Sequence, residues 1–223
     1  MLALNGLSVS GGKLTGGLAR IGELIQPLYA KILGQSRSAS RWKMDETRWS
    51  VFAEVNGKVG FRLWLWVVIT HNTCAYLLVP SRSSDVPKNH LGEDAEGILN
   101  ADRSSDYKAL GQNIHWQGAI LFVDHPEVPM DNNESERCLR NPVIGRKNYY
   151  GSGLVWSGTL TAALFTLFQT LLKNQIDPQK FPLAYFDACA QIGEKPPQNL
   201  DDFLPWSLSQ DQKCAWALPE KPP

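Results

Sequence analysis

Charged residues gather in one stretch of the chain, Asp131 to Asn148, which reads DNNESERCLRNPVIGRKN. The aspartate and asparagines that open it are preferred helix N-caps, and glutamates in a first turn suit the helix dipole. The cations that follow at once are Arg137, Arg140, Arg146 and Lys147. A carboxylate that holds a metal ion, beside cations that hold phosphates, would use these residue types. A well-capped surface helix with solvated charges would use the same types, so both interpretations stay open here.

The same stretch predicts its own local structure. We expect a helix that begins at the Asp131 cap and ends at Pro142, because proline lacks the N–H that a helix interior needs. Beyond the proline, Gly145 to Asn148 is expected to form a small basic turn. Arg137 and Arg140 lie three residues apart, which places them on one face of the predicted helix.

Length and composition limit the class of protein. A chain of 223 residues with 43% hydrophobic and 20% charged residues is ordinary for a soluble globular domain with a sizeable core. A formal net charge of zero argues against a protein that coats nucleic acid by bulk charge. The charges are nevertheless segregated, since Arg137 to Ile176 contains no acid. That segregation permits a local phosphate-binding surface on a neutral protein.

The cysteines and the apolar runs indicate the compartment. The four cysteines, Cys74, Cys138, Cys189 and Cys214, are scattered without a C-x-x-C pair. This pattern favours neither a zinc site nor a disulfide framework, and free thiols suit a reducing environment. No run reaches the roughly 18 apolar residues of a membrane span, and the first ten residues do not resemble a signal peptide. We therefore expect a cytoplasmic protein that contacts no membrane.

The acids must be positioned by a sheet in the first half of the chain. Residues 41–53 read as a strand whose alternation breaks around Asp45-Glu46, where a bulge or a functional edge is expected, and Asn56-Gly57 is a strong hairpin signal. Phe61 to Thr70 is a nearly continuous apolar run, typical of a central strand, and Thr73 to Val79 returns as a third strand. After a helix within residues 81–95, Gly97 to Asp102 reads as a short buried strand that ends in an acid.

Helices are expected on both sides of this sheet. Apolar residues recur at three and four between Leu18 and Ile32, although Pro27 should kink or divide that helix, and the residues before Gly17 read as a loose lead-in. Thr159 to Leu172 is predicted to be an apolar core helix whose threonines satisfy local backbone groups. We expect three parts: a helical lead-in at 1–40, a core at 41–176, and a proline-rich segment at 177–223 with a helix at 183–191 and a frayed tail after Ser209.

The order of these elements brings three acids together. A three-stranded antiparallel meander, a helix and a further strand ending in an acid are typical of a ribonuclease-H-like α/β (α+β) mixed sheet. In that arrangement an acid on the first strand lies beside one at the end of the fourth, and a third comes from a later helix. Here these are Asp45, Asp102 and Glu136. Three converging carboxylates repel one another unless cations are bound, and two Mg²⁺ ions about 4 Å apart would relieve that repulsion.

Four motifs sharpen this expectation: MDETRW at Met44 to Trp49, NADR at Asn100 to Arg103, DNNESER at Asp131 to Arg137, and GRKNYYGSG at Gly145 to Gly153. With them the chain resembles, from about Leu4 to Trp206, the catalytic domain of the Insertion Sequence 66 family of bacterial DDE transposases. These enzymes move a mobile element by DNA recombination.

The resemblance assigns roles to individual residues. It implies Asp45, Asp102 and Glu136 as the three metal carboxylates, with Glu134 as the alternative for the third. The cofactor implied is a pair of Mg²⁺ ions, for which Mn²⁺ can substitute. It also implies that four cations face DNA phosphates: Arg137, Arg140, Arg146 and Lys147. The partners implied are the DNA of the element ends and of the target, and also a second transposase copy or a related full-length transposase.

The chain also departs from the family pattern. Zinc-binding and coiled segments that family members carry at their start have no counterpart before Leu4. Only 33 residues separate Asp102 from Glu136, where family members carry a strand and a long helical insertion. We therefore expect a join near Gly111 to Ile114. The chain is thus expected to be an N-terminally truncated and internally deleted copy that lacks the fifth strand of the sheet and the helical insertion. The alternative is that the segment from His115 to Val123 takes the place of the missing strand.

Three hypotheses follow. The first is a DNA transposase domain that performs metal-dependent phosphodiester cleavage and strand transfer, although the deletion makes an inactive copy the expectation. The second is a non-catalytic remnant that binds DNA or a partner transposase through the surface from Arg137 to Lys147. The third is a decaying gene product that does not fold cooperatively.

Overall fold

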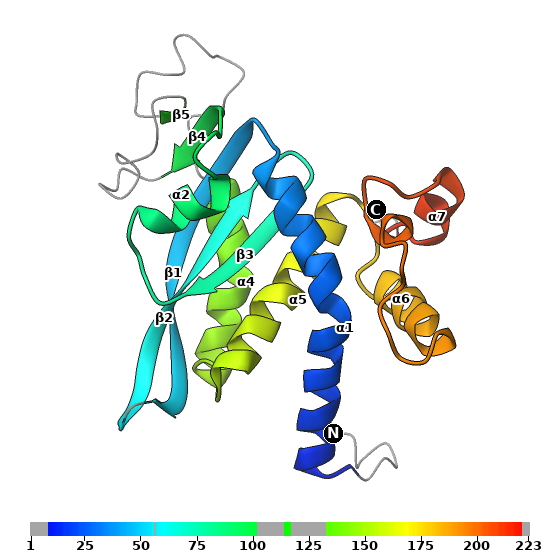
Figure 1. The fold of residues 1–223 in the computed structure, drawn as a ribbon, viewed down its shortest axis with the longest axis horizontal. Helices are drawn as coiled ribbons and strands as arrows, with labels where there is room; N and C mark the ends of the chain where they lie inside the picture. Colours follow the sequence, from blue (N-terminus) through cyan, green and yellow to red (C-terminus); the bar gives the residue numbers. More distant parts are fainter. Residues whose placement is uncertain (1–8, 56, 102–113, 117–132, 220–223) are drawn as a thin grey trace.

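A computed structural model describes residues 9–55, 57–101, 114–116 and 133–219. They form a mixed sheet with strand order β3-β2-β1-β4-β5 and helices on both of its faces (Figure 1). The chain is thus a mixed α/β protein, as the sequence predicts.

The first three strands form the predicted antiparallel meander. They are β1 (Arg41–Val55), β2 (Lys58–Ile69) and β3 (Cys74–Val79). The hairpin falls where the Asn-Gly signal placed it: Val55 pairs with Lys58, and Gly57 has a φ of 75°. The central strand β2 is the apolar run, and it is covered on both faces, since alternate residues of it enter the two hydrophobic clusters on either side of the sheet.

Two parallel strands extend the sheet beyond β1. Strand β4 (Gly97–Ala101) pairs with β1, and the short β5 (Ile114–Trp116) pairs with β4. The expectation that the fifth strand is missing is therefore wrong. Strand β5 begins at the predicted join, so the residues that follow the join supply the backbone partner that β4 needs. The predicted helix before β4 is α2 (Asp85–Leu91).

Helix α1 (Gly11–Arg37) is continuous and longer than expected. It begins at Gly11, where the sequence indicated a loose lead-in, and Pro27 lies inside it without dividing it. The turns on both sides of the proline are buried, with Leu24, Ile25 and Leu28 in the core. Burial of these side chains offsets the cost of a mid-helix proline, about 3 kcal/mol.

Helix α4 (Asn133–Tyr149) also continues through a proline. The predicted end at Pro142 and the predicted basic turn after it are both wrong. Proline cannot donate to the carbonyl four residues earlier, which belongs to Cys138. The Tyr76 hydroxyl donates to that carbonyl instead, at 2.8 Å. The acceptor is thus satisfied, and the helix continues through Pro142, which is buried.

Helix α5 (Val155–Lys173) covers the edge strand β3. Two of its threonines accept hydrogen bonds from β3 backbone N–H groups, Thr170 from Cys74 at 3.1 Å and Thr166 from Tyr76 at 2.8 Å. The predicted role of the threonines is confirmed, with β3 as an additional partner. By length and composition α5 could cross a membrane, but here it is the core helix that the sequence predicts.

The C-terminal segment packs onto the same core. Helix α6 (Lys180–Gln191) buries Phe181 and Tyr185 in a cluster with residues of α1 and α5. Up to residue 219 the tail is not frayed as predicted: α7 (Gln210–Ala215) follows a capping serine, and Ala217 forms a bridge with Ile176. The ring of Trp216 packs on that of Phe181, at 5.4 Å between centroids, which explains why this part of the tail is ordered.

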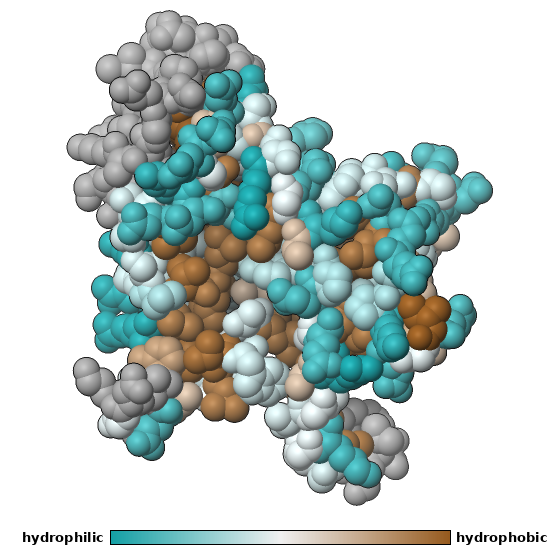
Figure 2. All heavy atoms as spheres, viewed as in Figure 1, coloured by the Kyte–Doolittle hydropathy of each residue, from teal (hydrophilic) through white to brown (hydrophobic). Residues whose placement is uncertain are grey.

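Figure 2 shows other apolar residues gathered on the viewed face, between the β1–β2 hairpin and α1.

Candidate active site

Asp45 lies in the middle of the site that the sequence predicts. It is half-buried in β1, and its Oδ1 accepts a hydrogen bond from the Glu46 backbone N–H at 2.8 Å. Pairing with β2 is regular through Asp45, which lies opposite Val67, so the bulge expected here is absent. The ladder shifts later, between Val51 and Glu54.

The end of β4 approaches Asp45 through its pairing register. The parallel ladder pairs Met44 with Ala101. Met44 immediately precedes Asp45 in β1, and Ala101, the last residue of β4, immediately precedes Asp102 in the sequence. Asp45 and Asp102 are both predicted metal carboxylates. Asp102 itself lies outside the described residues.

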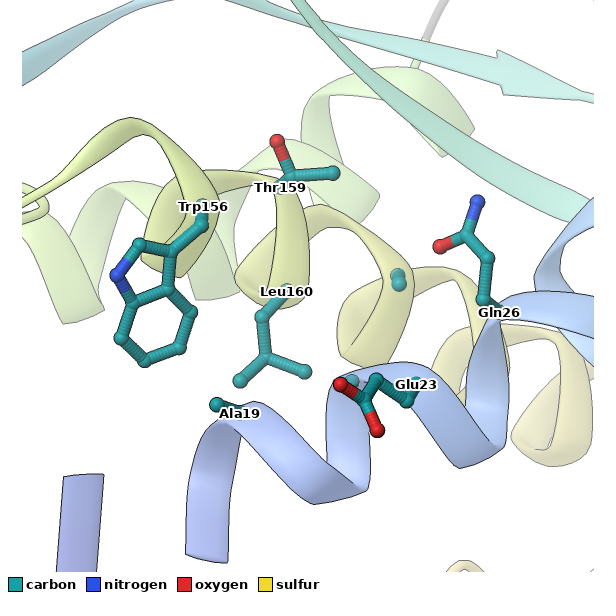
Figure 3. Close-up of a pocket in the computed structure, with 8 residues that line it drawn as sticks. Ala19, Glu23, Gln26, Trp156, Thr159 and Leu160 are labelled. Carbon is teal, nitrogen blue, oxygen red and sulfur yellow. The ribbon is translucent and has the colours of Figure 1, made fainter. Parts of the chain in front are cut away.

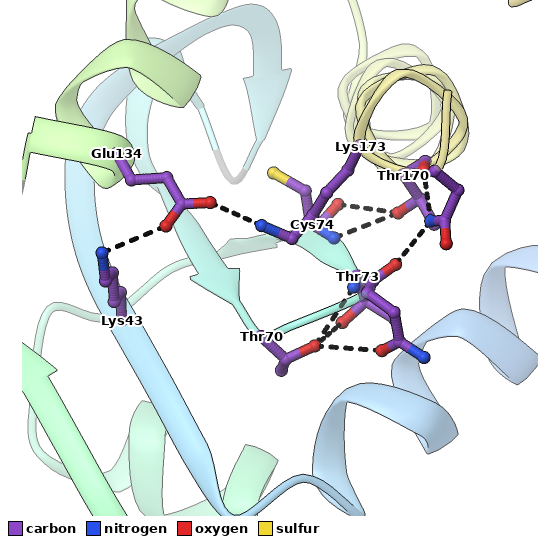
Figure 4. Close-up of polar contacts among 9 residues, drawn as sticks. Lys43, Thr70, Thr73, Cys74, Glu134, Thr170 and Lys173 are labelled. Carbon is purple, nitrogen blue, oxygen red and sulfur yellow. Dashed lines mark hydrogen bonds and ion pairs between the residues drawn. The ribbon is translucent and has the colours of Figure 1, made fainter. Parts of the chain in front are cut away.

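The two glutamates of α4 have different surroundings. Glu136 is exposed, whereas Glu134 is partly buried. Glu134 Oε2 lies 3.1 Å from Lys43 Nζ of β1, and its Oε1 lies 2.5 Å from Lys173 Nζ of α5 (Figure 4). Because Lys43 and Asp45 are two residues apart in one strand, they lie on the same face of the sheet, toward α4. The three side chains Lys43, Glu134 and Lys173 are called the lysine clamp below.

The clamp keeps its carboxylate ionised. Partial burial raises the pKa of Glu134, but the hydrogen bonds and charges of Lys173 and Lys43 outweigh burial, so the pKa lies below its ordinary value. Neighbouring thiols share the site: the hydrogen bond from Cys74 lowers the pKa of Cys138, and burial raises the pKa of Cys74. The sequence predicted neither lysine partner, because both are distant from Glu134 along the chain.

The four predicted DNA-facing cations divide into two groups. Arg137, Arg140 and Lys147 are exposed on α4. Arg146 instead turns toward the sheet, where it donates to the Arg48 carbonyl and, at 3.3 Å, to Thr47 Oγ1. Arg146 therefore attaches the end of α4 to β1, and the three exposed cations remain as the solvent-facing set.

The GSG end of the fourth motif joins the sheet. Ser152 donates its backbone N–H to the Ser50 carbonyl and accepts from the Phe52 N–H, both at 2.9 Å. Trp49 Nε1 also donates to Ser152 Oγ at 2.9 Å. These bonds, with the clamp at the other end of the helix, align α4 along β1. The fourth sequence motif thus has a structural role here.

A hollow lies elsewhere in the molecule, between α1 and α5 (Figure 3). Its volume is about 430 Å³, and apolar side chains such as Trp156 and Leu160 line it. Its carboxylate, Glu23, pairs with Arg20 at 2.7 Å. Of the predicted site residues that the structure describes, none lines this hollow.

Comparison with known families decides what this arrangement belongs to. The model of the transposase IS66 family matches residues 1–115 and 111–159. The chain is a member of the IS66 transposase family. The two matches meet at residues 111–115, where the sequence predicts a join, so the family pattern itself divides at that point. This supports the predicted internal deletion.

Two relatives are uncharacterised proteins of Sinorhizobium fredii (strain NBRC 101917 / NGR234). The protein y4hP is 35% identical over 91 residues, which are 41% of this chain and 16% of the relative. The protein y4jD is 28% identical over 98 residues, which are 44% of this chain and 19% of the relative. The similarity thus spans less than a fifth of either relative.

The IS66 family resemblance implies Mg²⁺, and the donor chemistry of the chain can be tested against it. Mg²⁺ prefers carboxylate oxygens, with water and substrate phosphates completing its coordination. Asp45 and Glu136 can supply the carboxylate oxygens. Among the residues that the structure describes, no three His, Cys, Asp or Glu side chains are close enough to hold a metal ion. The third predicted ligand, Asp102, is not among them. The residue types therefore fit Mg²⁺, and the structure describes two of the three predicted carboxylates, Asp45 and Glu136.

Proposed function

We propose that this IS66 family chain is the ribonuclease-H-like catalytic core of a DNA transposase. It would cut DNA at the ends of an insertion sequence and join the freed 3′ hydroxyl to target DNA. The observation that carries the proposal is the parallel register of β1 and β4, which pairs the residues just before Asp45 and Asp102. The alignment of α4 along β1 adds the helix that bears Glu136.

Each site residue has a role in this proposal. Asp45, Asp102 and Glu136 would hold two Mg²⁺ ions, which supply charge stabilisation at the attacking and leaving oxygens when bound. Glu136 is preferred to Glu134 because its carboxylate is exposed, whereas Glu134 is engaged by two lysines. The exposed cations of α4 would hold DNA phosphates without reading base sequence. The compartment proposed is the cytoplasm.

Nicking of supercoiled plasmid DNA in Mn²⁺ or Mg²⁺ tests this function. Asp45→Asn and Glu136→Gln should each abolish nicking by the parent chain, because each removes a metal carboxylate. Glu23→Gln, which changes an exposed ion pair of α1, is the matched control and should nick at the parental rate. Nicking that survives both site substitutions would contradict the mechanism.

A second function is supported by the exposed charge on α4. Arg137, Arg140 and Lys147 face solvent, and the chain from Arg137 to Ile176 contains no acid. A copy that lacks catalysis would still bind DNA through this surface. Its affinity should then fall steeply with salt, with a log–log slope of about −0.9 for each phosphate neutralised. Binding that is insensitive to salt would contradict it.

A matched pair of substitutions tests whether Lys147 binds DNA while Arg146 holds α4 on β1. Lys147→Gln should weaken DNA binding and reduce the salt slope by about 1. Arg146→Gln should instead destabilise the fold, since Arg146 holds β1. Equal effects of the two substitutions on the salt slope would show that Arg146 also contacts DNA.

A further inference from the structure

We propose that the lysine clamp is the device that positions the metal-binding helix, and that Glu134 is a positioning residue which holds no metal. The inference rests on the proposed function in one respect: the placement of Glu136 matters only if Glu136 binds metal. Its structural part, the fixing of α4 on β1 and α5, can be measured without any metal ion.

The clamp joins three elements through one carboxylate. Each oxygen of Glu134 has its own ammonium partner, Lys43 from β1 at 3.1 Å and Lys173 from α5 at 2.5 Å. The three side chains are 19–31% exposed, well below the 45% and 68% of the surface pair Arg20–Glu23. Partly shielded charge pairs are screened less than exposed ones. The clamp therefore constrains α4 more strongly than an ordinary surface ion pair would.

Helix geometry links Glu134 to Glu136. Residues two apart on an α-helix differ by about 200° around its axis. When the lysines hold Glu134 between β1 and α5, Glu136 must point away from both lysines, on a side of α4 that the clamp leaves open. The structure agrees, because Glu136 is exposed. The clamp thus sets the rotation of the helix as well as its position.

Further contacts hold α4 in the same orientation. One turn after Glu134, the Cys138 carbonyl accepts from the Tyr76 hydroxyl at 2.8 Å. Leu139 is buried against the sheet, and Arg146 bonds β1 near the far end. The first turn of the helix has Glu134 as its polar tie to the sheet, so a change there should loosen that turn without releasing the rest.

The charge balance also argues against Glu134 as a ligand. Two ammonium groups, those of Lys43 and Lys173, surround the one carboxylate of Glu134. A metal ion at Glu134 would have to displace both ammonium groups and would meet their repulsion. An exposed carboxylate such as Glu136 carries neither cost.

The test combines hydrogen exchange and Mn²⁺ binding in the full chain, at a temperature where every variant is folded. Glu134→Gln keeps the size of the side chain and removes its charge; Glu23→Gln is the control. In Glu134→Gln, amide exchange in residues 134–139 should rise about tenfold while exchange in β2 stays unchanged, as expected for local opening. Its Mn²⁺ dissociation constant should rise about tenfold, as for loss of a group that orients a metal ligand.

The lysine variants separate positioning from general stability. Lys173→Met should reproduce both effects of Glu134→Gln, and Lys173→Arg should restore both, because arginine keeps the cation. In Glu136→Gln, Mn²⁺ binding should be lost while exchange in α4 stays at the parental level. Recovery of exchange together with Mn²⁺ affinity in Lys173→Arg is the result that a merely global destabilisation does not produce.

Three outcomes are decisive. Unchanged exchange in residues 134–139 of Glu134→Gln would overturn the clamp. Loss of Mn²⁺ binding in Glu134→Gln with parental binding in Glu136→Gln would also overturn it, because Glu134 would then be the ligand. Local loosening in a chain whose parent binds no Mn²⁺ would support the clamp as a structural device and reject the proposed function, so the two failures are distinguishable.

Discussion

At Gly151 the backbone passes so close to β1 that no side chain fits. A Cβ there would lie 2.1 Å from the Ser50 carbonyl oxygen, and φ is 150°. Gly151→Ala should therefore destabilise the fold by about 3 kcal/mol, through strain at a close backbone approach. Gly153→Ala is the matched control, since nothing lies within 4 Å of its added Cβ. Urea unfolding of both variants measures the difference, and equal midpoints would contradict the assigned role.

His90 predicts how stability responds to pH. Burial, with a smaller contribution from the charge of Arg37, lowers its pKa from 6.5 to about 4, and Ser36 Oγ lies 3.1 Å from its Nε2. Between pH 6.5 and about 4 the unfolded chain binds a proton that the folded chain refuses, so stability falls as pH falls through this window. The full loss is about 3 kcal/mol.

Urea midpoints at pH 7 and pH 5 check this. The parent should lose stability between them, and His90→Gln should lose less, since it removes the titrating ring. His71→Gln, at an exposed histidine, should keep the parental pH dependence. A parental slope in His90→Gln would assign the effect to another group.

The edge strand β3 is an element whose stability depends on side chains from other elements. Its outward N–H groups donate to threonines of α5, and the Tyr76 carbonyl accepts from the Tyr29 hydroxyl at 2.7 Å. Covering an edge in this way also prevents pairing with another chain. The sequence predicted the strand and the helix, but the bonds between them depend on residues about 90 positions apart.

Thr166→Val tests the cover on β3. The substitution keeps the shape of the side chain and leaves the Tyr76 N–H buried without its acceptor, which should cost about 1–3 kcal/mol. Thr159→Val is the control, because Thr159 is exposed and its hydroxyl donates to the Val155 carbonyl of its own helix. Calorimetry should show a lower midpoint for Thr166→Val alone; equal midpoints would mean that β3 does not need α5 as an acceptor.

Local signals predicted elements well where one signal dominated. The Asn-Gly turn, the apolar run of β2 and the core helix α5 are all confirmed. These signals failed where a side chain distant in the sequence replaced a hydrogen bond that the local backbone could not form. Pro142 does not end α4, because the Tyr76 hydroxyl satisfies the Cys138 carbonyl, and no pattern near Pro142 could have indicated that.

At the scale of the whole molecule, the sheet has five strands in spite of the predicted deletion. Residues at the join supply β5, and β4 therefore has neighbours on both sides. The sequence placed Asp45 and the end of β4 side by side, which the register supports, and left the third carboxylate open between Glu134 and Glu136. That choice depends on Lys43 and Lys173, which only the fold brings to α4.

Thermal unfolding of the purified chain with and without Mn²⁺, beside Asp45→Asn, tests the central claim most directly. A ligand that binds only the folded state stabilises it by about 2.7 kcal/mol at one hundred times its dissociation constant, or about 5–10 °C for a chain of this size. We predict that Mn²⁺ raises the midpoint of the parent and of Glu23→Gln by this amount and leaves Asp45→Asn unchanged. A cooperative transition in the parent that Mn²⁺ does not move would contradict a metal site at Asp45.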